Sequence, residues 1–187
     1  MIATLTFAGL RIGELCALRW RDVDLAGGWL HIHGTKSDEA DRRVKMRAAL
    51  RDELVVVRRR HLEAPQDGFV FATLTGNRPN PNNFRSRVLK AAVKRANENL
   101  ATAGLPPLPH RITPHSLRRT FASVLYALGE DPGVVMDEMG HNDPGLALRV
   151  YRQAMRRDQG ENAKLRVLVE GADSTTTLSQ PIASVAA

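Results

Sequence analysis

The sequence is poor in cysteine and in long apolar runs, and each shortage excludes a class of protein. Cys16 is the one cysteine among 187 residues, so no intrachain disulfide can form and the chain suits a reducing, cytoplasmic compartment. No Cys/His spacing typical of zinc sites occurs, and we expect neither a metal nor a cofactor. No stretch is apolar enough to span a bilayer, and residues 2–10 lack the basic leader of a signal peptide.

Basic residues are in excess. The chain has 27 lysines and arginines against 20 acidic residues, which gives a net charge of +7 and a sequence pI near 10.3. Such a balance favours a polyanionic partner, of which nucleic acid is the commonest. The length fits one ordinary domain, and 43% hydrophobic residues are enough to build its core.

The hydrophobic periodicity predicts an α+β domain, mostly helical with a small antiparallel sheet. We expect one folded domain over residues 1–170 and a disordered tail over 171–187, which is rich in Ser, Thr and Ala. A hairpin is expected from strands 29–33 and 43–46, with 69–71 as a third, edge strand. Helices are expected at 2–8, 12–18, 48–62 and 84–101, and after the capping pairs Thr113-Pro114, Asp131-Pro132 and Asp143-Pro144.

Five short windows, in a fixed order, carry the chemistry. They supply two arginines, two histidines, a lysine and a tyrosine, which together can cleave a phosphodiester without a metal. Charge develops on the non-bridging oxygens in the transition state, and arginine suits that charge because its planar fork binds two oxygens and stays protonated. The windows are Ala8-Gly9-Leu10-Arg11-Ile12-Gly13-Glu14-Leu15, Thr35-Lys36, His115-Ser116-Leu117-Arg118, Gly140-His141 and Tyr151.

This ordered set resembles the catalytic domain of the tyrosine recombinases, the phage-integrase family. The likeness extends over about residues 3–165 and implies the tyrosine-recombinase catalytic-core fold. It also implies a role for each residue. Two arginines would bind the phosphate, a glutamate would support the first of them, one histidine would assist proton transfer and the other would donate to the phosphate, and a lysine would protonate the leaving 5′ oxygen. In that order the residues are Arg11, Arg118, Glu14, His115, His141 and Lys36.

The nucleophile is easy to choose because the chain has only two tyrosines. Tyr126 lies near the apolar stripe of the expected helix after Thr113, so we interpret it as a core residue. Tyr151 follows the second histidine. The resemblance therefore assigns to Tyr151 an attack on the phosphodiester that leaves a 3′-phosphotyrosyl link and a free 5′ hydroxyl.

Further basic residues are candidates for contacts with double-stranded DNA, because phosphate contacts supply most non-specific affinity. They are Arg85, Arg87, Lys90 and Lys94 on one expected helix and Arg119 beside the second arginine window. The family carries a helical core-binding domain ahead of this one, so we expect that domain and the first part of the catalytic domain to be missing here. The full-length protein would act as a homotetramer on DNA, with 162–169 docking on a neighbouring protomer or packing in cis.

Other interpretations of the same residues remain open. Basic helical faces are usually only solvated, and His31 and His33, which share one face of a strand, are more often an exposed sheet face than a metal pair. A leading hypothesis of site-specific DNA recombination of the integrase type therefore competes with three others. These are a truncated DNA-binding remnant without catalysis, a nicking enzyme similar to type IB topoisomerases, and a generic basic helical protein.

Overall fold

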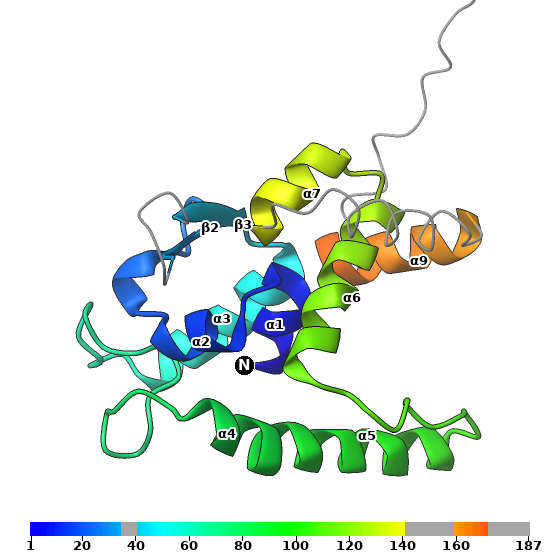
Figure 1. Ribbon diagram of the computed structural model, residues 1–187, viewed down its shortest axis with the longest axis horizontal. Coiled ribbons are helices and arrows are strands. Elements are labelled where there is room, and N and C mark those ends of the chain that lie inside the picture. Colours follow the sequence, from blue (N-terminus) through cyan, green and yellow to red (C-terminus); the bar gives the residue numbers. More distant parts are fainter. Residues whose placement is uncertain (35–40, 141–158, 172–187) are drawn as a thin grey trace, which may run out of the picture.

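The fold is α+β, mostly helical with one small antiparallel sheet, as the hydrophobic pattern predicts (Figure 1). The structure, a computed structural model, describes residues 1–34, 41–140 and 159–171. Its elements in chain order are α1 (Ile2–Ala8), α2 (Ile12–Ala17), the 3-10 helix η1 (Trp20–Asp22), β1 (Val23–Asp24), β2 (Trp29–Ile32), β3 (Arg42–Lys45), α3 (Ala48–Arg60), α4 (Pro81–Asn83), the π-helical η3 (Phe84–Leu89), α5 (Lys90–Thr102), α6 (Pro114–Ala127), α7 (Pro132–Met139) and α9 (Gln159–Glu170).

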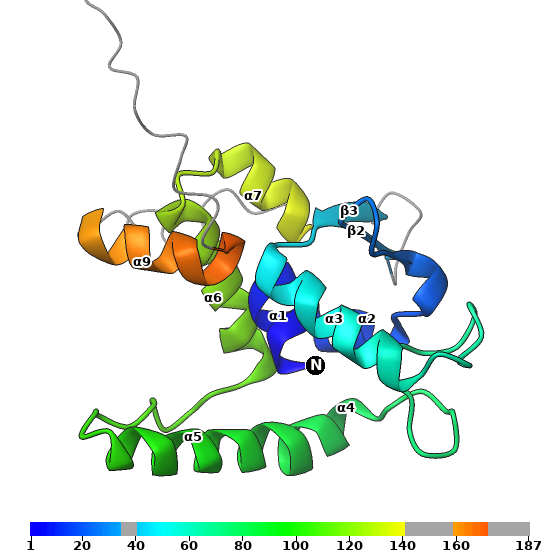
Figure 2. The same cartoon turned by 180° about the vertical axis from the view of Figure 1, so that it is seen from behind.

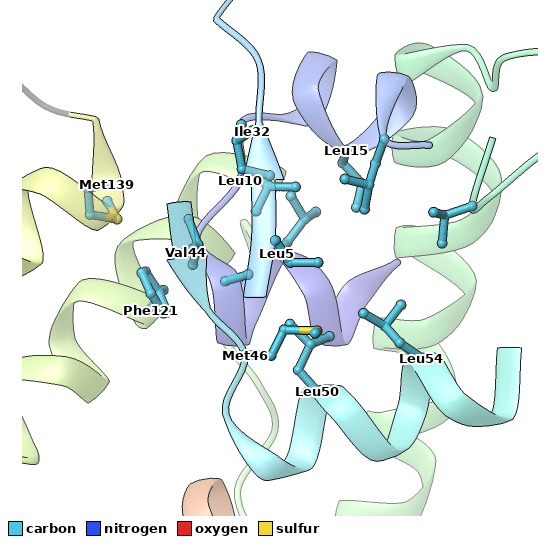
Figure 3. Packing of buried hydrophobic residues seen from close by; sticks show 14 of the residues in the cluster. Leu5, Leu10, Leu15, Ile32, Val44, Met46, Leu50, Leu54, Phe121 and Met139 are labelled. Carbon is cyan, nitrogen blue, oxygen red and sulfur yellow. The ribbon is translucent and has the colours of Figure 1, made fainter. Parts of the chain in front are cut away.

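Helix α1 occupies the centre of the molecule, with α6 on one side and α3 on the other (Figures 1 and 2). Its side chains Leu5 and Ala8 are fully buried, and Figure 3 shows Leu5 among leucines of α2 and α3, side chains of the sheet and Phe121 of α6. Each of these elements presents one apolar face, and burying those faces together supplies most of the favourable free energy of folding. Because α1 contacts both α3 and α6, it sets how the part of the molecule that contains α3 and the sheet packs against α6 and α7.

Gly9 ends α1 and allows a close approach between segments far apart in the sequence. It adopts the left-handed conformation, with φ of 61°, and a β-carbon at this position would overlap the ring of Phe121 on α6. Only glycine satisfies both demands at low cost. The turn that follows is therefore pressed against α6, and it carries Arg11.

The hairpin is confirmed, with strands that differ by a residue from the expected bounds. Strand β2 pairs antiparallel with β3, with Leu30 opposite Val44 and Ile32 opposite Arg42. Leu30, Ile32 and Val44 are buried, so one face of the sheet covers the core, as strict alternation of side chains requires.

The expected third strand at 69–71 is wrong. The third strand is β1, which pairs with β2 across the short turn before Trp29. Phe69 forms only an isolated bridge with Arg19, and its ring lies under the Arg19 guanidinium at 4.4 Å. The apolar run at 69–71 anchors this loop by burying Val70, whose N–H donates to the carbonyl of Leu18. A short apolar run thus belongs to a partly buried loop rather than to a strand of the sheet.

Helices α4, η3 and α5 form one long rod along an edge of the molecule (Figures 1 and 2). Phe84 and Leu89 anchor its first part in the core, whereas α5 contains no fully buried residue. The expected helix at 84–101 is therefore confirmed, with a π-helical first turn and an extra turn in front. Its long exposed surface carries the basic side chains at 85, 87, 90 and 94.

Helices α6 and α7 begin where the capping pairs predict. Thr113 accepts from the N–H of Ser116 while the Ser116 hydroxyl accepts from the N–H of Thr113, and Asp131 accepts from the N–H of Gly133. Tyr126 on α6 is 2% exposed, which confirms it as a core residue. The helix expected after Asp143 lies outside the described residues.

Helix α9 packs in cis. It contacts α3 and α6, its Val169 is fully buried against Val124 and Leu128, and Arg166 donates to the carbonyl of Leu128 at 2.7 Å. Of the two arrangements left open for 162–169, this one is present in the isolated chain. Across the described segments, no helix combines the length and apolar character needed to cross a membrane.

Candidate active site

Arg11 lies in the turn between α1 and α2, where the buried carboxylate of Glu14 accepts hydrogen bonds from both its backbone and its side chain. One oxygen of Glu14 accepts from the backbone N–H of Arg11 at 2.7 Å and the other from its guanidinium at 2.8 Å. Arg11 is the residue ahead of α2, so Glu14 caps the first turn of that helix while orienting the guanidinium. The Glu14 side chain is 3% exposed and that of Arg11 is 49% exposed, so the arginine faces solvent and the glutamate lies beneath it.

A second arginine, Arg42 of β3, completes the shell around Glu14. Its two terminal nitrogens donate to the two carboxylate oxygens at 3.0 and 2.8 Å, a bidentate pair with both side chains less than a tenth exposed. The nearest nitrogen of Arg118 lies 4.0 Å from the same carboxylate. A single buried negative charge is therefore surrounded by three guanidinium groups.

These neighbours control the ionisation of the cluster. Burial by itself would raise the pKa of Glu14, but the hydrogen bonds and charge of Arg42, followed by the backbone and side chain of Arg11, lower it to about 2. Burial, with the charge of Arg11 next, lowers the pKa of Arg118 to about 10, while Glu14 opposes that shift. At neutral pH the carboxylate is ionised and Arg118 remains a cation.

Arg118 and His115 come from the first turns of α6. Arg118 is 3% exposed and donates to the carbonyls of Gly9 and Met139, so it joins the end of α1 to the end of α7. His115, one turn earlier, is exposed. The capped start of α6 thus positions one buried cation and one accessible imidazole beside the Arg11 turn.

The end of α7 receives a bond from each arginine of the cluster. Three consecutive carbonyls, those of residues 138, 139 and 140, accept from Arg42 at 2.9 Å, from Arg118, and from Arg11 at 2.7 Å, respectively. Gly140 adopts the left-handed conformation that ends the helix, with φ of 59°. Cations at the carboxyl end of a helix are favourable because they satisfy its free carbonyls.

A pocket of about 220 Å³ opens over this cluster. Its lining includes Arg11, Arg118 and His115, together with Arg85 of η3. Arg85 and Pro114 also border a larger groove of about 370 Å³, which runs along the rod and past His110. Lys90 lies on the rim of that groove. The basic side chains of Arg85 and Lys90 therefore lie along the groove that leads from the pocket towards α5.

The sequence-predicted residues divide into three groups. Arg11, Glu14, His115 and Arg118 come together as described, with Arg85 at the same pocket and Lys90 at the adjoining groove. Arg87, Lys94 and Arg119 are exposed but line neither pocket. Lys36, His141 and Tyr151 lie outside the described residues, so their placement stays a prediction. The structure does describe the neighbours of two of these residues. Gly34 and Asp41 lie at the two ends of the hairpin turn that contains Lys36, and Gly140 directly precedes His141.

The base of that turn is closed by a small polar cluster. His33 contacts Asp41 at 2.9 Å and Asp22 at 3.2 Å, and the N–H of Gly34 donates to Asp41 at 2.8 Å. The hydrogen bond that His33 makes to the Asp41 carboxylate, ahead of the contribution of Asp22, raises the pKa of His33. His31 and His33 are both exposed, and within the described residues no group of His, Cys, Asp and Glu side chains is arranged to hold a metal ion.

Arg42 is the residue that sequence reasoning missed. Its strand places Arg42 and Val44 on the same face by the period of two, and Val44 is fully buried. An arginine on the same strand face as a buried residue requires a carboxylate partner, and Glu14 was already a candidate site residue. The alternation of buried and exposed positions along β3 was therefore the sequence signal by which Arg42 could have been found.

Comparison with known proteins places the chain in a family. A family model described as "Phage integrase family" matches residues 1–157. The chain belongs to the phage integrase family. It is 34% identical over 137 residues to the tyrosine recombinase XerC of Pseudomonas fluorescens, a match that covers 72% of this chain and 41% of that protein. It is 31% identical over 161 residues to the tyrosine recombinase XerA of Thermococcus kodakarensis, covering 84% of this chain and 52% of the relative.

The fold of the family is also confirmed by a solved structure. The Tn1549 transposon integrase, in complex with transposon right end DNA, superposes with a TM-score of 0.67 at 22% identity, covering 89% of this chain and 56% of that one. At this identity the likeness establishes the catalytic-core fold. The chain spans about half the length of the relatives that it matches.

Proposed function

We propose that this chain is the strand-transferase domain of a site-specific tyrosine recombinase of the integrase type. The observation that carries the proposal is the convergence of Arg11, Arg118 and His115 on one pocket, although Arg11 is far from the other two in the sequence. A scissile phosphate is the ligand that this set of groups fits, because the exposed guanidinium of Arg11 can bind its oxygens beside the exposed imidazole of His115, while buried Arg118 adds positive charge beneath them. Membership of the phage integrase family supports the same reaction.

The two arginines do different work in this proposal. Arg11 is half exposed and held from below by Glu14, so its guanidinium is aimed at the pocket before any ligand arrives. Arg118 is buried and remains charged, so it contributes a fixed positive field at the pocket floor. Donors that need no reorganisation stabilise the charge of a transition state most effectively.

The reaction that we propose is a transesterification through Tyr151. The phenolic oxygen attacks the phosphorus, the Tyr–O–P bond forms and the bond to the 5′ oxygen breaks. His115 accepts the phenolic proton, Lys36 gives a proton to the leaving 5′ oxygen, and His141 donates a hydrogen bond to the phosphate. Attack by a 5′ hydroxyl on the phosphotyrosyl link reverses these steps, so strand joining needs neither ATP nor a metal.

Double-stranded DNA is the proposed partner, and the rod is its contact surface outside the pocket. Arg85 and Lys90 border the groove that continues from the pocket, Arg87 and Lys94 add exposed cations on the rod, and Arg119 adds one on α6. Such groups contact phosphates and give affinity that falls steeply with salt. For the full-length protein we propose a homotetramer on DNA and a cytoplasmic location.

Covalent trapping tests the proposal. The chain is incubated with a panel of nicked duplexes from the attachment region of its own genome, in which a short 5′-hydroxyl fragment can diffuse away after cleavage. The mixture is denatured and probed for a protein–DNA adduct. The matched control for Tyr151→Phe is Tyr126→Phe, which makes the same chemical change at the other tyrosine.

An adduct that forms with the Tyr126→Phe variant and disappears with Tyr151→Phe is the expected result. Salt-sensitive DNA binding without any adduct would instead support a DNA-binding remnant. Relaxation of supercoiled plasmid without preference for a site would support a nicking enzyme of the type IB topoisomerase kind.

A further inference from the structure

Arg42 uses every nitrogen of its side chain within the cluster. The side chain is 8% exposed, and all three of its nitrogens donate: two to Glu14 and the third, Nε, to the carbonyl of Glu138. It does not line the pocket above the cluster. Because this guanidinium is buried and does not line the pocket, a ligand there cannot reach it, and its contribution must pass through its neighbours.

Through Glu14, Arg42 fixes the direction in which Arg11 points. Each Glu14 oxygen accepts one bond from Arg11 and one from Arg42, so the two arginines together fix the orientation of the carboxylate. Without the Arg42 fork, that plane could rotate towards the buried charge of Arg118, which lies 4.0 Å away. The guanidinium of Arg11 would then lose its fixed orientation.

Through Glu138, Arg42 also holds the end of α7. A β-carbon on Gly140 would lie 3.2 to 3.3 Å from the Cδ, Nε and Nη1 atoms of Arg42, so the helix end packs directly on this side chain. The residue after Gly140 is His141, and Arg42 itself begins the strand that follows the turn with Lys36. One side chain therefore joins the three segments that carry Arg11, Lys36 and His141.

We propose that Arg42 is a positioning residue for strand transfer. It aligns Arg11 through Glu14 and holds the end of α7 in place against the hairpin. This inference rests on the proposed function. It needs the guanidinium and not only a positive charge, because a lysine ammonium has no planar fork and cannot contact both Glu14 oxygens and the Glu138 carbonyl in this geometry.

The test compares Arg42→Lys with Arg43→Lys in the full chain. Arg43 is the next residue on β3, exposed, with its guanidinium 4.7 Å from the ring of Trp29, so the same change there alters the opposite face of the strand. The formation rate of the Tyr151 adduct and the Kd for the same duplex are measured. We expect Arg42→Lys to lower the rate by about 10- to 100-fold with Kd changed by less than about twofold, as for other groups that orient a reacting residue.

Carboxyl and guanidinium NMR give a readout that does not depend on activity. In the wild-type chain Glu14 should titrate near 2 and the Nε–H of Arg11 should be ordered. In Arg42→Lys the Glu14 pKa should rise and that order should fall, whereas Arg43→Lys should leave both unchanged. If the wild-type chain forms no adduct, the proposed function fails while this measurement still decides the role of Arg42.

Three results would overturn the inference. One is an equal adduct rate in the two variants. Another is an Arg11 signal in Arg42→Lys that keeps its wild-type order. The third, which stands even if Arg42→Lys does not fold, is a wild-type Glu14 that titrates at the ordinary value of 4.5.

Discussion

Replacing Glu14 with glutamine should lower the free energy of unfolding. The size of that loss follows from how strongly the folded protein favours the ionised carboxylate of Glu14. Glutamine keeps the shape of the side chain but has one acceptor oxygen, so two of the four bonds from Arg11 and Arg42 disappear and an amide N–H faces guanidinium donors. Three guanidinium groups then remain around a neutral side chain. Removing one partner of a buried ion pair generally costs about 3–5 kcal/mol.

The pKa of Glu14 gives an independent magnitude. Its value in the folded protein is about 2, against an ordinary value of 4.5. Because the folded-state pKa is the lower one, ionised Glu14 favours the folded state. Its contribution is complete above about 4.5 and is lost as the pH falls towards 2. At 1.36 kcal/mol for each pKa unit, it amounts to about 3 kcal/mol at neutral pH.

Urea unfolding of the wild type and of Glu14→Gln between pH 7 and pH 2.5 measures both quantities. We expect the variant to be less stable by about 3 kcal/mol at pH 7, and the gap to narrow steadily below pH 4.5 as the wild-type carboxyl is protonated. Glu63→Gln, which changes an exposed carboxyl, should stay within about 0.5 kcal/mol of the wild type. A gap of less than about 1 kcal/mol at pH 7, or one that does not change with pH, would refute the reasoning.

Three further predictions concern other parts of the structure. Gly9→Ala should lower the free energy of unfolding by about 2 kcal/mol or more, because φ is 61° and the new methyl overlaps Phe121; thermal and urea unfolding measure it. Lys90→Ala with Lys94→Ala should reduce the slope of log K for duplex DNA against log salt by about 0.9 for each phosphate that these lysines neutralise, in a binding titration. Lys36→Ala should slow adduct formation on an ordinary duplex by about 100-fold, and much less on one whose leaving 5′ oxygen is replaced by sulfur, because a thiolate leaves without a proton.

The first two of these predictions have control variants in the same chain. Gly13→Ala changes a glycine at which a β-carbon meets nothing within 4 Å, so it should not show the loss of stability expected at Gly9. Arg51→Ala, on the exposed face of α3, should leave a larger salt slope than the double variant. Equal rates for the sulfur and oxygen substrates in Lys36→Ala would remove Lys36 from the role of general acid.

The sequence by itself determined the parts of this protein that depend on local signals. The starts of α6 and α7 follow from Thr113-Pro114 and Asp131-Pro132, since a capping oxygen and a proline act on backbone within one turn. The β2–β3 hairpin follows from alternation, and the residues suited to phosphate chemistry follow from their side-chain types.

Only the tertiary structure decided how those pieces meet. It placed β1, not 69–71, on the sheet, because strand pairing depends on which backbone reaches the free edge of β2. It buried Arg118 while leaving His115 exposed on the same helix, and it gave Glu14 a second partner in Arg42. The free energy of such buried charges depends on neighbours far away in the chain, and no local pattern contains those neighbours.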